Sequence, residues 1–169
     1  MTKVLLLMGP GGAGKSTIAQ FLVEKSGYAL LDGDREDTEF FPDGDQWLPE
    51  SKERLKLAHL KILRKAIELS SQGKSVVVDY IIFGQYEEFL RLFKAAFASS
   101  LEIKVLMPSQ NELNKRDAER KCWTTGPERI ASVYNELLLL KNVIGANHFL
   151  DTSGQTPDET FRMYFAERR

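Results

Sequence analysis

The stretch MGPGGAGKST, from Met8 to Thr17, decides the fold of this chain. It fits the pattern G-x-x-x-x-G-K-[ST], in which glycines let the backbone turn its N–H groups towards an anion. The preceding residues, Lys3 to Met8, form an apolar run typical of a buried parallel strand, and Ile18 to Lys25 has apolar residues at helical spacing. A strand, a glycine-rich loop and a helix in this order place the partially positive helix N-terminus at the anion. The stretch therefore predicts a phosphate-binding loop.

This loop supplies the first candidate binding residues. The Lys15 amine can reach the β- and γ-phosphates of a nucleotide, and the Ser16 hydroxyl can bind Mg²⁺, so ATP and Mg²⁺ are the expected cofactors. Lys15 is counted among the candidate catalytic residues as well. The expected nucleotide contacts in the loop are Gly9, Gly11, Gly12, Ala13, Gly14, Lys15, Ser16 and Thr17.

Length and composition set the class of protein. With 169 residues and ordinary hydrophobic and charged fractions, the chain is expected to form one domain over residues 1–169. The net charge is −1, so no overall field attracts nucleic acid or an anionic membrane. No apolar run reaches the length of a membrane span, no signal peptide is recognised, and the single Cys122 cannot form an intramolecular disulfide. These features lead us to expect a cytoplasmic protein.

Strands and helices alternate along the chain. The expected strands are Lys3–Met8, Tyr28–Leu31, Ser75–Tyr80, Leu101–Met107 and His148–Leu150. The expected helices are Ile18–Lys25, Ser51–Ser71, Gln85–Phe97, Gln110–Lys121, Pro127–Val143 and one that begins with Thr156 as N-cap. This alternation predicts an α/β fold with a parallel sheet covered on both faces, and ligands bind at the carboxyl ends of the strands in such sheets.

Three aspartates lie at expected strand ends. Asp32 and Asp34 follow the second strand and Asp79 ends the third, so all three are expected at the edge that carries the phosphate loop. Phosphoryl transfer needs a carboxylate near the acceptor hydroxyl and oxygen ligands around Mg²⁺. Asp79 is similar in position to the second metal-site motif of nucleotide hydrolases. The alternative for each is a solvated turn, which Asp and Gly also favour.

Two arginines are candidates for contacts to the transferring phosphate. Arg116 and Arg120 lie four residues apart on an expected helix and so would share a face. Charge that develops on a phosphoryl group needs cations that close over it, which makes residues 116–129 a candidate lid. The alternative is a surface helix, on which acidic neighbours pair with these arginines; those neighbours are Glu112, Asp117 and Glu119.

The segment from Asp32 to Glu50 holds eight carboxylates, one cation (Arg35) and three large aromatic residues. It is either a solvated loop or the pocket for a phosphate acceptor, because it follows the candidate catalytic aspartates directly. As a pocket, its charge predicts a neutral or cationic acceptor.

The motifs together resemble the small P-loop kinases, a group that includes shikimate kinase, gluconate kinase, adenylylsulfate kinase, chloramphenicol phosphotransferase and the kinase domain of polynucleotide kinase. Leu31 to Asp34 is similar to the D-G-D of adenylylsulfate kinase and the D-x-D of shikimate kinase. Val77 to Tyr80 looks like the third-strand end of the chloramphenicol phosphotransferase type. Arg116 to Arg120 resembles the R-x-x-x-R that opens the lid of these enzymes.

The resemblance implies a P-loop NTPase fold of three layers, α/β/α, with strand order 2-3-1-4-5 and a helical lid. It also implies roles. Asp34 would orient or deprotonate the acceptor hydroxyl, and Asp32 would hold Mg²⁺, with Asp79 and Ser16 as further candidate ligands. Arg116 or Arg120 would stabilise the transferring phosphoryl group. Arg120 would also contact the nucleotide, and the loop from Asp151 to Pro157, which contains Thr156, would pack beside adenine.

The expected activity is that of an ATP-dependent kinase that phosphorylates a hydroxyl of a small molecule. The chain lacks the anion-reading arginines that the resemblance leads one to expect for shikimate, which counts against an anionic acceptor. Two alternatives remain open: a regulatory ATPase or switch, and a polynucleotide or RNA-end kinase. The last would need a basic track beyond the lid, and the acids around Asp34 count against it.

Overall fold

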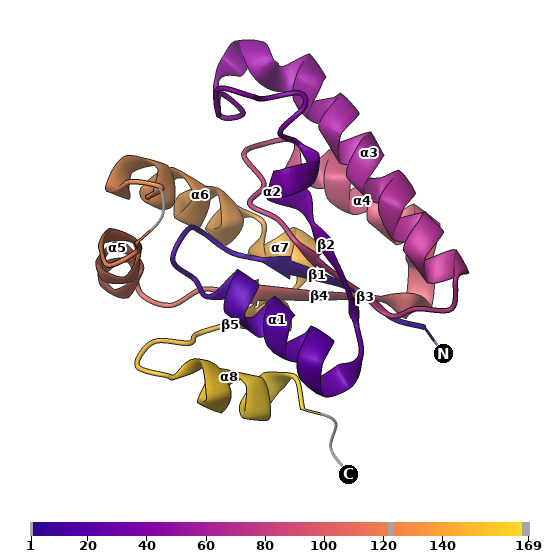
Figure 1. Cartoon of the computed structure of the whole chain (residues 1–169). Helices are drawn as coiled ribbons and strands as arrows, with labels where there is room; N and C mark the ends of the chain where they lie inside the picture. The colour runs from indigo at the N-terminus through magenta and orange to yellow at the C-terminus, as the bar shows by residue number, and fades with distance from the viewer. Residues whose placement is uncertain (1, 122–123, 167–169) are drawn as a thin grey trace.

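A computed structural model describes residues 2–121 and 124–166 of the chain. Its centre is a five-stranded parallel sheet in the order β2-β3-β1-β4-β5, so the expected α/β fold and strand order are confirmed. Helices cover both faces of this sheet (Figure 1). The strands are β1 (Val4–Met8), β2 (Ala29–Asp32), β3 (Val76–Asp79), β4 (Leu101–Leu106) and β5 (Phe149–Leu150).

The strand register brings the polar strand ends together. Leu7 on β1 pairs with Asp79 on β3, and Asp79 pairs in turn with Asp32 on β2. Because the strands are parallel, the phosphate loop after Met8 leaves the sheet at the same edge as these two aspartates. The sheet alone therefore gathers the candidate residues from three separate parts of the sequence.

Helices of ordinary length surround the sheet. The α-helices are α1 (Lys15–Ser26), α2 (Gly33–Glu36), α3 (Lys52–Ser71), α4 (Tyr86–Phe97), α5 (Gln110–Ala118), α6 (Pro127–Leu139), α7 (Lys141–Ile144) and α8 (Pro157–Tyr164). Short 3₁₀ turns are η1 (Pro49–Ser51), η2 (Ala98–Ser100) and η3 (Ala146–His148). Within the described ranges, no helix combines the length and the apolar character needed to cross a membrane.

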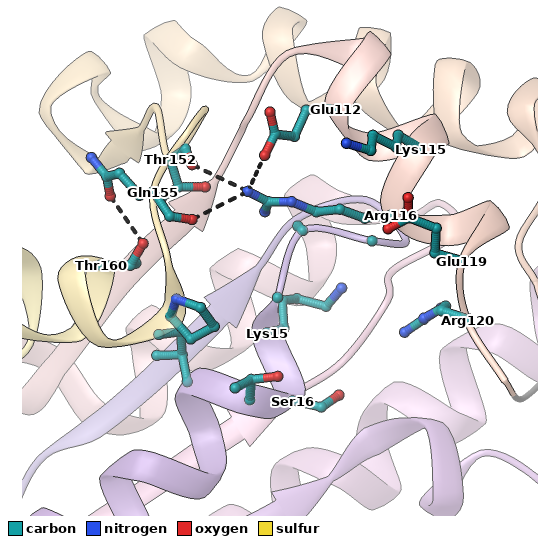
Figure 2. Close-up of a pocket in the computed structure, with 16 residues that line it drawn as sticks. Lys15, Ser16, Glu112, Lys115, Arg116, Glu119, Arg120, Thr152, Gln155 and Thr160 are labelled. Atoms are coloured by element: carbon teal, nitrogen blue, oxygen red, sulfur yellow. Dashed lines mark hydrogen bonds and ion pairs between the residues drawn. The ribbon is translucent and has the colours of Figure 1, made fainter.

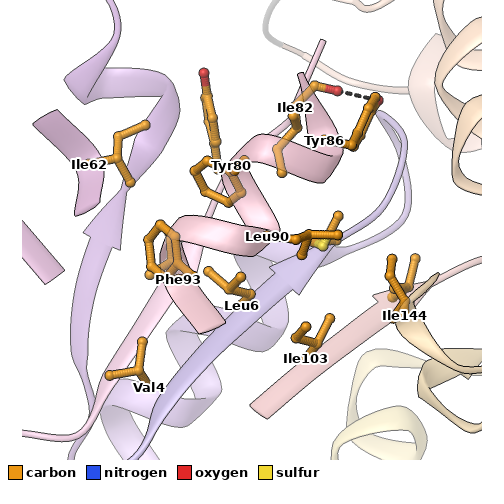
Figure 3. Close-up of a cluster of buried hydrophobic side chains, with 14 of the residues drawn as sticks. Val4, Leu6, Ile62, Tyr80, Ile82, Tyr86, Leu90, Phe93, Ile103 and Ile144 are labelled. Carbon is orange, nitrogen blue, oxygen red and sulfur yellow. Dashed lines mark hydrogen bonds between the residues drawn. The ribbon is translucent and has the colours of Figure 1, made fainter. Parts of the chain in front are cut away.

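Alternation along β1 builds a core on each face of the sheet. Leu5 and Leu7 join the cluster formed with α1 and α8, whereas Val4 and Leu6 join the cluster formed with α3 and α4. Figure 3 shows Leu90 and Phe93 of α4 packed over the strands in this second cluster. Both faces of the strand are fully buried, which explains the continuous apolar run before the phosphate loop.

Three segments differ from the sequence-based expectation. The helix expected over Gln110–Lys121 ends at Ala118, and the one expected over Pro127–Val143 is divided at Leu140 into α6 and α7. The short helix α2 was not expected. It forms because the side chain of Asp32 accepts a hydrogen bond from the Arg35 N–H and caps its first turn. Cys122 and Trp123, which belong to the expected lid, lie outside the described residues.

Candidate active site

The phosphate loop connects β1 to α1 in the predicted way. Gly14 has a φ of +92°, a conformation that L side chains rarely adopt, and it lies directly before the first residue of α1, Lys15. The Lys15 Nζ is buried and donates to the carbonyl oxygens of Gly9 (2.9 Å) and Pro10 (3.1 Å). The amine is thus held inside the loop, on the side where phosphate groups would bind.

A cavity of about 440 Å³ opens above this loop. One wall is the loop and the start of α1, the second is α5 with the residues after it, and the third is the segment between β5 and α8 (Figure 2). Four cationic side chains line it: Lys15, Lys115, Arg116 and Arg120. A pocket of this size, with a helix N-terminus and four cations, suits a polyanionic ligand such as a nucleotide.

Two carboxylates, the buried Asp79 and the partly buried Asp34, act on the Lys15 amine. Burial lowers the pKa of Lys15, and the charges of Asp79 and Asp34 oppose that shift. Asp34 accepts a hydrogen bond from the Ile81 N–H at 3.1 Å. Burial raises the pKa of Asp34 to about 7, although the nearby Lys15 charge pulls it down. Asp34 can therefore exchange a proton near neutral pH, as a general base must.

The predicted metal ligands are in different environments. Asp79 is buried, and its Oδ1 has no hydrogen-bond partner among the described residues. Ser16 is exposed to the nucleotide cavity. Asp32, by contrast, is exposed and caps α2. Hydroxyl and carboxylate oxygens suit Mg²⁺, so Ser16 and Asp79 fit this ion best, and phosphate oxygens and water would complete its coordination.

The backbone at Asp34 is fixed by a contact between the residues that follow β2 and β3. A Cβ at Gly33 would lie 2.6 Å from Cγ of Tyr80, so glycine is needed here for space. The Tyr80 hydroxyl donates to the buried Asp37 carboxylate at 3.1 Å. Burial raises the pKa of Asp37 to about 6. Asp34 thus lies between Gly33 and Asp37, and both of these residues contact Tyr80. The sequence does not reveal this arrangement.

Asp117 holds the two ends of the expected lid together. The sequence pattern indicates this residue only as a possible ion-pair partner of the arginines. Asp117 is buried and accepts hydrogen bonds from the N–H groups of Thr125 and Gly126, both at 3.0 Å. Burial alone would raise the pKa of Asp117, but the hydrogen bonds from Gly126 and Thr125 hold it below its ordinary value. A Cβ on Gly11 would collide with the Thr125 side chain, so this turn packs directly on the phosphate loop.

The expectation that Arg116 and Arg120 share a helix face is wrong. The helix ends at Ala118, because the chain turns back to bring its Thr125 and Gly126 N–H groups to Asp117. Arg120 lies beyond the helix and donates from Nη1 to Asp117 at 3.4 Å. Both arginines nevertheless line the nucleotide cavity.

The two arginines lie in different parts of the cavity (Figure 2). Arg116 pairs with Glu112 and donates to the carbonyl oxygens of Thr152 and Gln155, both at 3.4 Å. It therefore extends towards the segment expected beside adenine. The side chain of Arg120 lies nearer to Ser16 than that of Arg116 does (Figure 2).

The segment between β5 and α8 forms the third wall of the nucleotide cavity. Neighbours of Thr156 line this wall, and Thr156 itself does not. Thr152, Gln155 and Pro157 line the cavity. The Thr156 side chain accepts from the Glu159 N–H and completes the predicted capping box of α8. Its side chain is thus used for capping, and a nucleotide contact by Thr156 stays a proposal.

Three of the eight acids of the Asp32–Glu50 segment form ion pairs with α3. Lys61 pairs with Glu36 and Glu39, and Lys65 also pairs with Glu36. Arg54 pairs with Asp45 at 2.6 Å. These ion pairs offset part of the negative charge on which the expectation of a neutral or cationic acceptor rested, so the residues of the second cavity described below also bear on acceptor charge.

Comparison with known proteins supports this description. A family model described as an AAA domain matches residues 4–130. The chain belongs to this family. A search of curated protein sequences finds no match. At the level of fold, the solved structures below agree with the predicted resemblance to small P-loop kinases.

The fold is shared with kinases whose acceptors differ. A sugar kinase from Janibacter sp. HTCC2649 superimposes with a TM-score of 0.74 at 15% identity, over 96% of this chain and 92% of that one. Shikimate kinase from Acinetobacter baumannii gives 0.63 at 18%, over 96% and 90%. A chain of an RNA repair complex gives 0.64 at 21%, over 84% of this chain and 46% of that one. At these identities the likeness establishes the fold alone. The identity of the acceptor has to be inferred from the residues of the site.

Replacing Asp117 by asparagine tests the lid closure. An amide has one acceptor oxygen where the carboxylate has two, so one of the two backbone N–H groups would lose its partner, at a cost of about 1–3 kcal/mol. We expect faster hydrogen exchange at the Thr125 and Gly126 amides and a lower turnover, with nucleotide affinity changed much less. The exposed Asp158, which pairs with Lys25, provides a matched Asp→Asn control. Unchanged exchange at both amides would contradict the proposed closure.

Proposed function

We propose that this protein is an ATP- and Mg²⁺-dependent phosphotransferase that phosphorylates a hydroxyl group of a small molecule. The observation that carries the proposal is that Asp34, which accepts from the Ile81 N–H and has a pKa raised to about 7, lies near enough to the buried Lys15 of the phosphate loop for each charge to act on the other's pKa. A binding module has no need of such a carboxylate, whereas a hydrolase can use one to activate water, so the assay below has to separate hydrolysis from transfer. A kinase needs one to take the proton of its acceptor.

In the proposed reaction, the acceptor oxygen forms a bond to the γ-phosphorus while the bond from that phosphorus to the bridging oxygen of ADP breaks. The acceptor proton passes to Asp34. Lys15 binds the phosphate oxygens, and Arg120 stabilises the charge that develops on the transferring group. Ser16 and Asp79 would hold Mg²⁺, which supplies charge neutralisation at the phosphates when bound.

A transfer assay tests this function. Purified protein, Mg²⁺ and ATP with a labelled γ-phosphate would be incubated with a panel of hydroxyl compounds, and both ADP release and label on the compound would be followed. We expect at least one compound to accelerate ADP release and to carry the label. Label that appears only as inorganic phosphate, at a rate that no compound changes, would instead support a regulatory ATPase. Label on the 5′ end of an oligonucleotide alone would favour an RNA-end kinase, whose structural basis here is the likeness to the RNA repair chain.

The two lid arginines are expected to differ in effect. Arg120→Ala should lower kcat by about 10²-fold or more, since its proposed contact is to charge present only in the transition state. Arg116→Ala should mainly raise KM for ATP, because Arg116 is directed to the Thr152 and Gln155 carbonyls. Steady-state kinetics of both variants measures the split. Equal losses of kcat in the two variants would argue that both arginines contact the transferring phosphoryl group.

A further inference from the structure

A second cavity, of about 370 Å³, lies outside the nucleotide cavity. Its walls come from three places: the segment between α2 and α3, the loop between β3 and α4, and one side of α6. The residues that line it are Trp47, Phe83, Glu128, Arg129, Ser132, Val133 and Glu136.

Each wall of this cavity is linked to the proposed catalytic residues. Phe83 lies two residues after Ile81, whose N–H binds Asp34. Trp47 follows Gln46, which donates to Asp37 at 3.4 Å. The helix α6 begins two residues after Thr125, whose side chain packs on Gly11 of the phosphate loop. The walls of the cavity are thus close in sequence to residues that contact Asp34, Asp37 and the phosphate loop, and we take this side of the site as the entrance for the phosphate acceptor.

The acidic groups of the cavity are arranged on one helix face. Glu128, Ser132 and Glu136 are spaced four residues apart on α6, and their side chains therefore project on the same side. The two glutamates are about 12 Å apart along the helix axis. Within residues 2–121 and 124–166, neither of them takes part in an ion pair, in contrast to Glu36, Glu39 and Asp45.

The one cation of the cavity already has an aromatic partner. The Arg129 guanidinium lies over the Trp47 ring at 4.6 Å from its centroid, while Trp47 itself is 46% exposed. This contact favours a fixed arginine that extends the aromatic surface. Phe83 and Val133 complete an apolar wall. The cavity thus offers two carboxylates without an ion pair among the described residues, one of which, Glu136, accepts from the Ser132 hydroxyl at 3.4 Å, together with an aromatic surface.

We propose that the acceptor bound here is an alcohol that carries a protonated amine and an aromatic or similarly apolar body. This inference rests on the proposed function and names the acceptor class for it. Ammonium groups form charge-assisted hydrogen bonds with carboxylates, and aromatic faces attract both apolar groups and cations. An acceptor with a carboxylate would instead be repelled by Glu128 and Glu136. The negative charge that selects the acceptor in this proposal is that of Glu128 and Glu136 on α6.

Binding of three matched compounds tests the inference without requiring catalysis. The probes are 2-amino-1-phenylethanol, 1-phenylethanol and mandelate, which share a phenyl ring and a benzylic hydroxyl and differ in bearing an ammonium, a methyl or a carboxylate group. Their affinities would be measured by NMR titration of the protein saturated with a non-hydrolysable ATP analogue and Mg²⁺. We expect the amine to bind about tenfold or more tightly than the neutral alcohol, and mandelate to bind most weakly.

Glutamine variants locate the effect. The double variant Glu128→Gln, Glu136→Gln is expected to lose the preference for the amine while still binding 1-phenylethanol. Glu68→Gln, at an exposed position on α3 away from both cavities, is the matched control and should keep the preference. A preference for mandelate, equal affinities of amine and neutral alcohol, or an unchanged preference in the double variant would each overturn the inference. Phosphoryl transfer to an acceptor of another class would still leave the proposed function standing, so the two claims fail separately.

Discussion

Replacing Lys15 by alanine is expected to abolish most phosphoryl transfer, with a loss of about 10²–10³-fold in kcat and weaker ATP binding as well. The amine is the cation most deeply placed in the phosphate loop, and it also faces Asp34 and Asp79. Its removal takes away a phosphate contact that is made in the ground state and becomes stronger as charge develops in the transition state, so both binding and kcat should suffer. It also leaves two neighbouring carboxylates without their counter-charge, which should raise the pKa of Asp34 further.

Equilibrium binding of ATP and single-turnover transfer measure the two parts of the Lys15→Ala effect. Lys25→Ala is a suitable control, because that lysine lies on the last turn of the same helix and pairs with Asp158 at the surface. The control is expected to bind ATP and to turn over like the parent protein. A Lys15→Ala protein that did the same would invalidate the assignment of the phosphate loop.

Replacing Asp34 by asparagine is expected to lower turnover by about 10²-fold or more while nucleotide affinity changes little. The amide oxygen can still accept from the Ile81 N–H, so the local geometry should be kept. The parent enzyme should gain activity as pH rises through about 7, where Asp34 loses its proton, and the variant should lack this rise. Kinetics from pH 5.5 to 8.5 would show it. A variant that keeps the rise would assign it to another group.

The same substitution makes a prediction for stability. The pKa of Asp34 is raised in the folded protein from the ordinary 3.8 to about 7, so between these values the folded state binds more protons than the unfolded state. Stability contributed by this group therefore falls as pH rises through that window, and the charged form is destabilising above it. Asp34→Asn should raise Tm at pH 8 and lose that advantage towards pH 4. Asp43→Asn, at an exposed position, is the control and should show no such dependence.

The sheet and the phosphate loop could be predicted from the sequence because their signals are local. The apolar run of β1, the glycines before Lys15 and the capping box at Thr156 each depend on residues within a few positions of one another. The strand order came from the resemblance to a known family. Lys15 and Asp34 were found in this way, and the structure places them close enough to shift each other's pKa.

The lid and the acceptor side depend on distant contacts, and there the sequence was a poor guide. Residues 110–121 read as a continuous helix, and the early end at Ala118 follows from hydrogen bonds that Asp117 makes to Thr125 and Gly126. An aspartate eight residues before a Thr-Gly turn is a weak signal for such a bond. The sequence likewise showed no sign of ion pairs for the acids after Asp32. In the structure, Lys61 of α3, about 25 positions further along the chain, pairs with Glu36 and Glu39.

The contact between Gly33 and Tyr80 also limits how the sequence can change over evolution. Any side chain at position 33 would enter the volume of the Tyr80 ring, and that ring is itself tied to Asp37 through its hydroxyl. Among homologous chains, positions 33 and 80 should therefore vary together, with alanine or serine at 33 only where a smaller residue replaces the tyrosine. A substitution at either position alone would displace the neighbouring Asp34 carboxylate. Correlated substitutions at positions 33 and 80 should therefore be detectable when homologous sequences are compared.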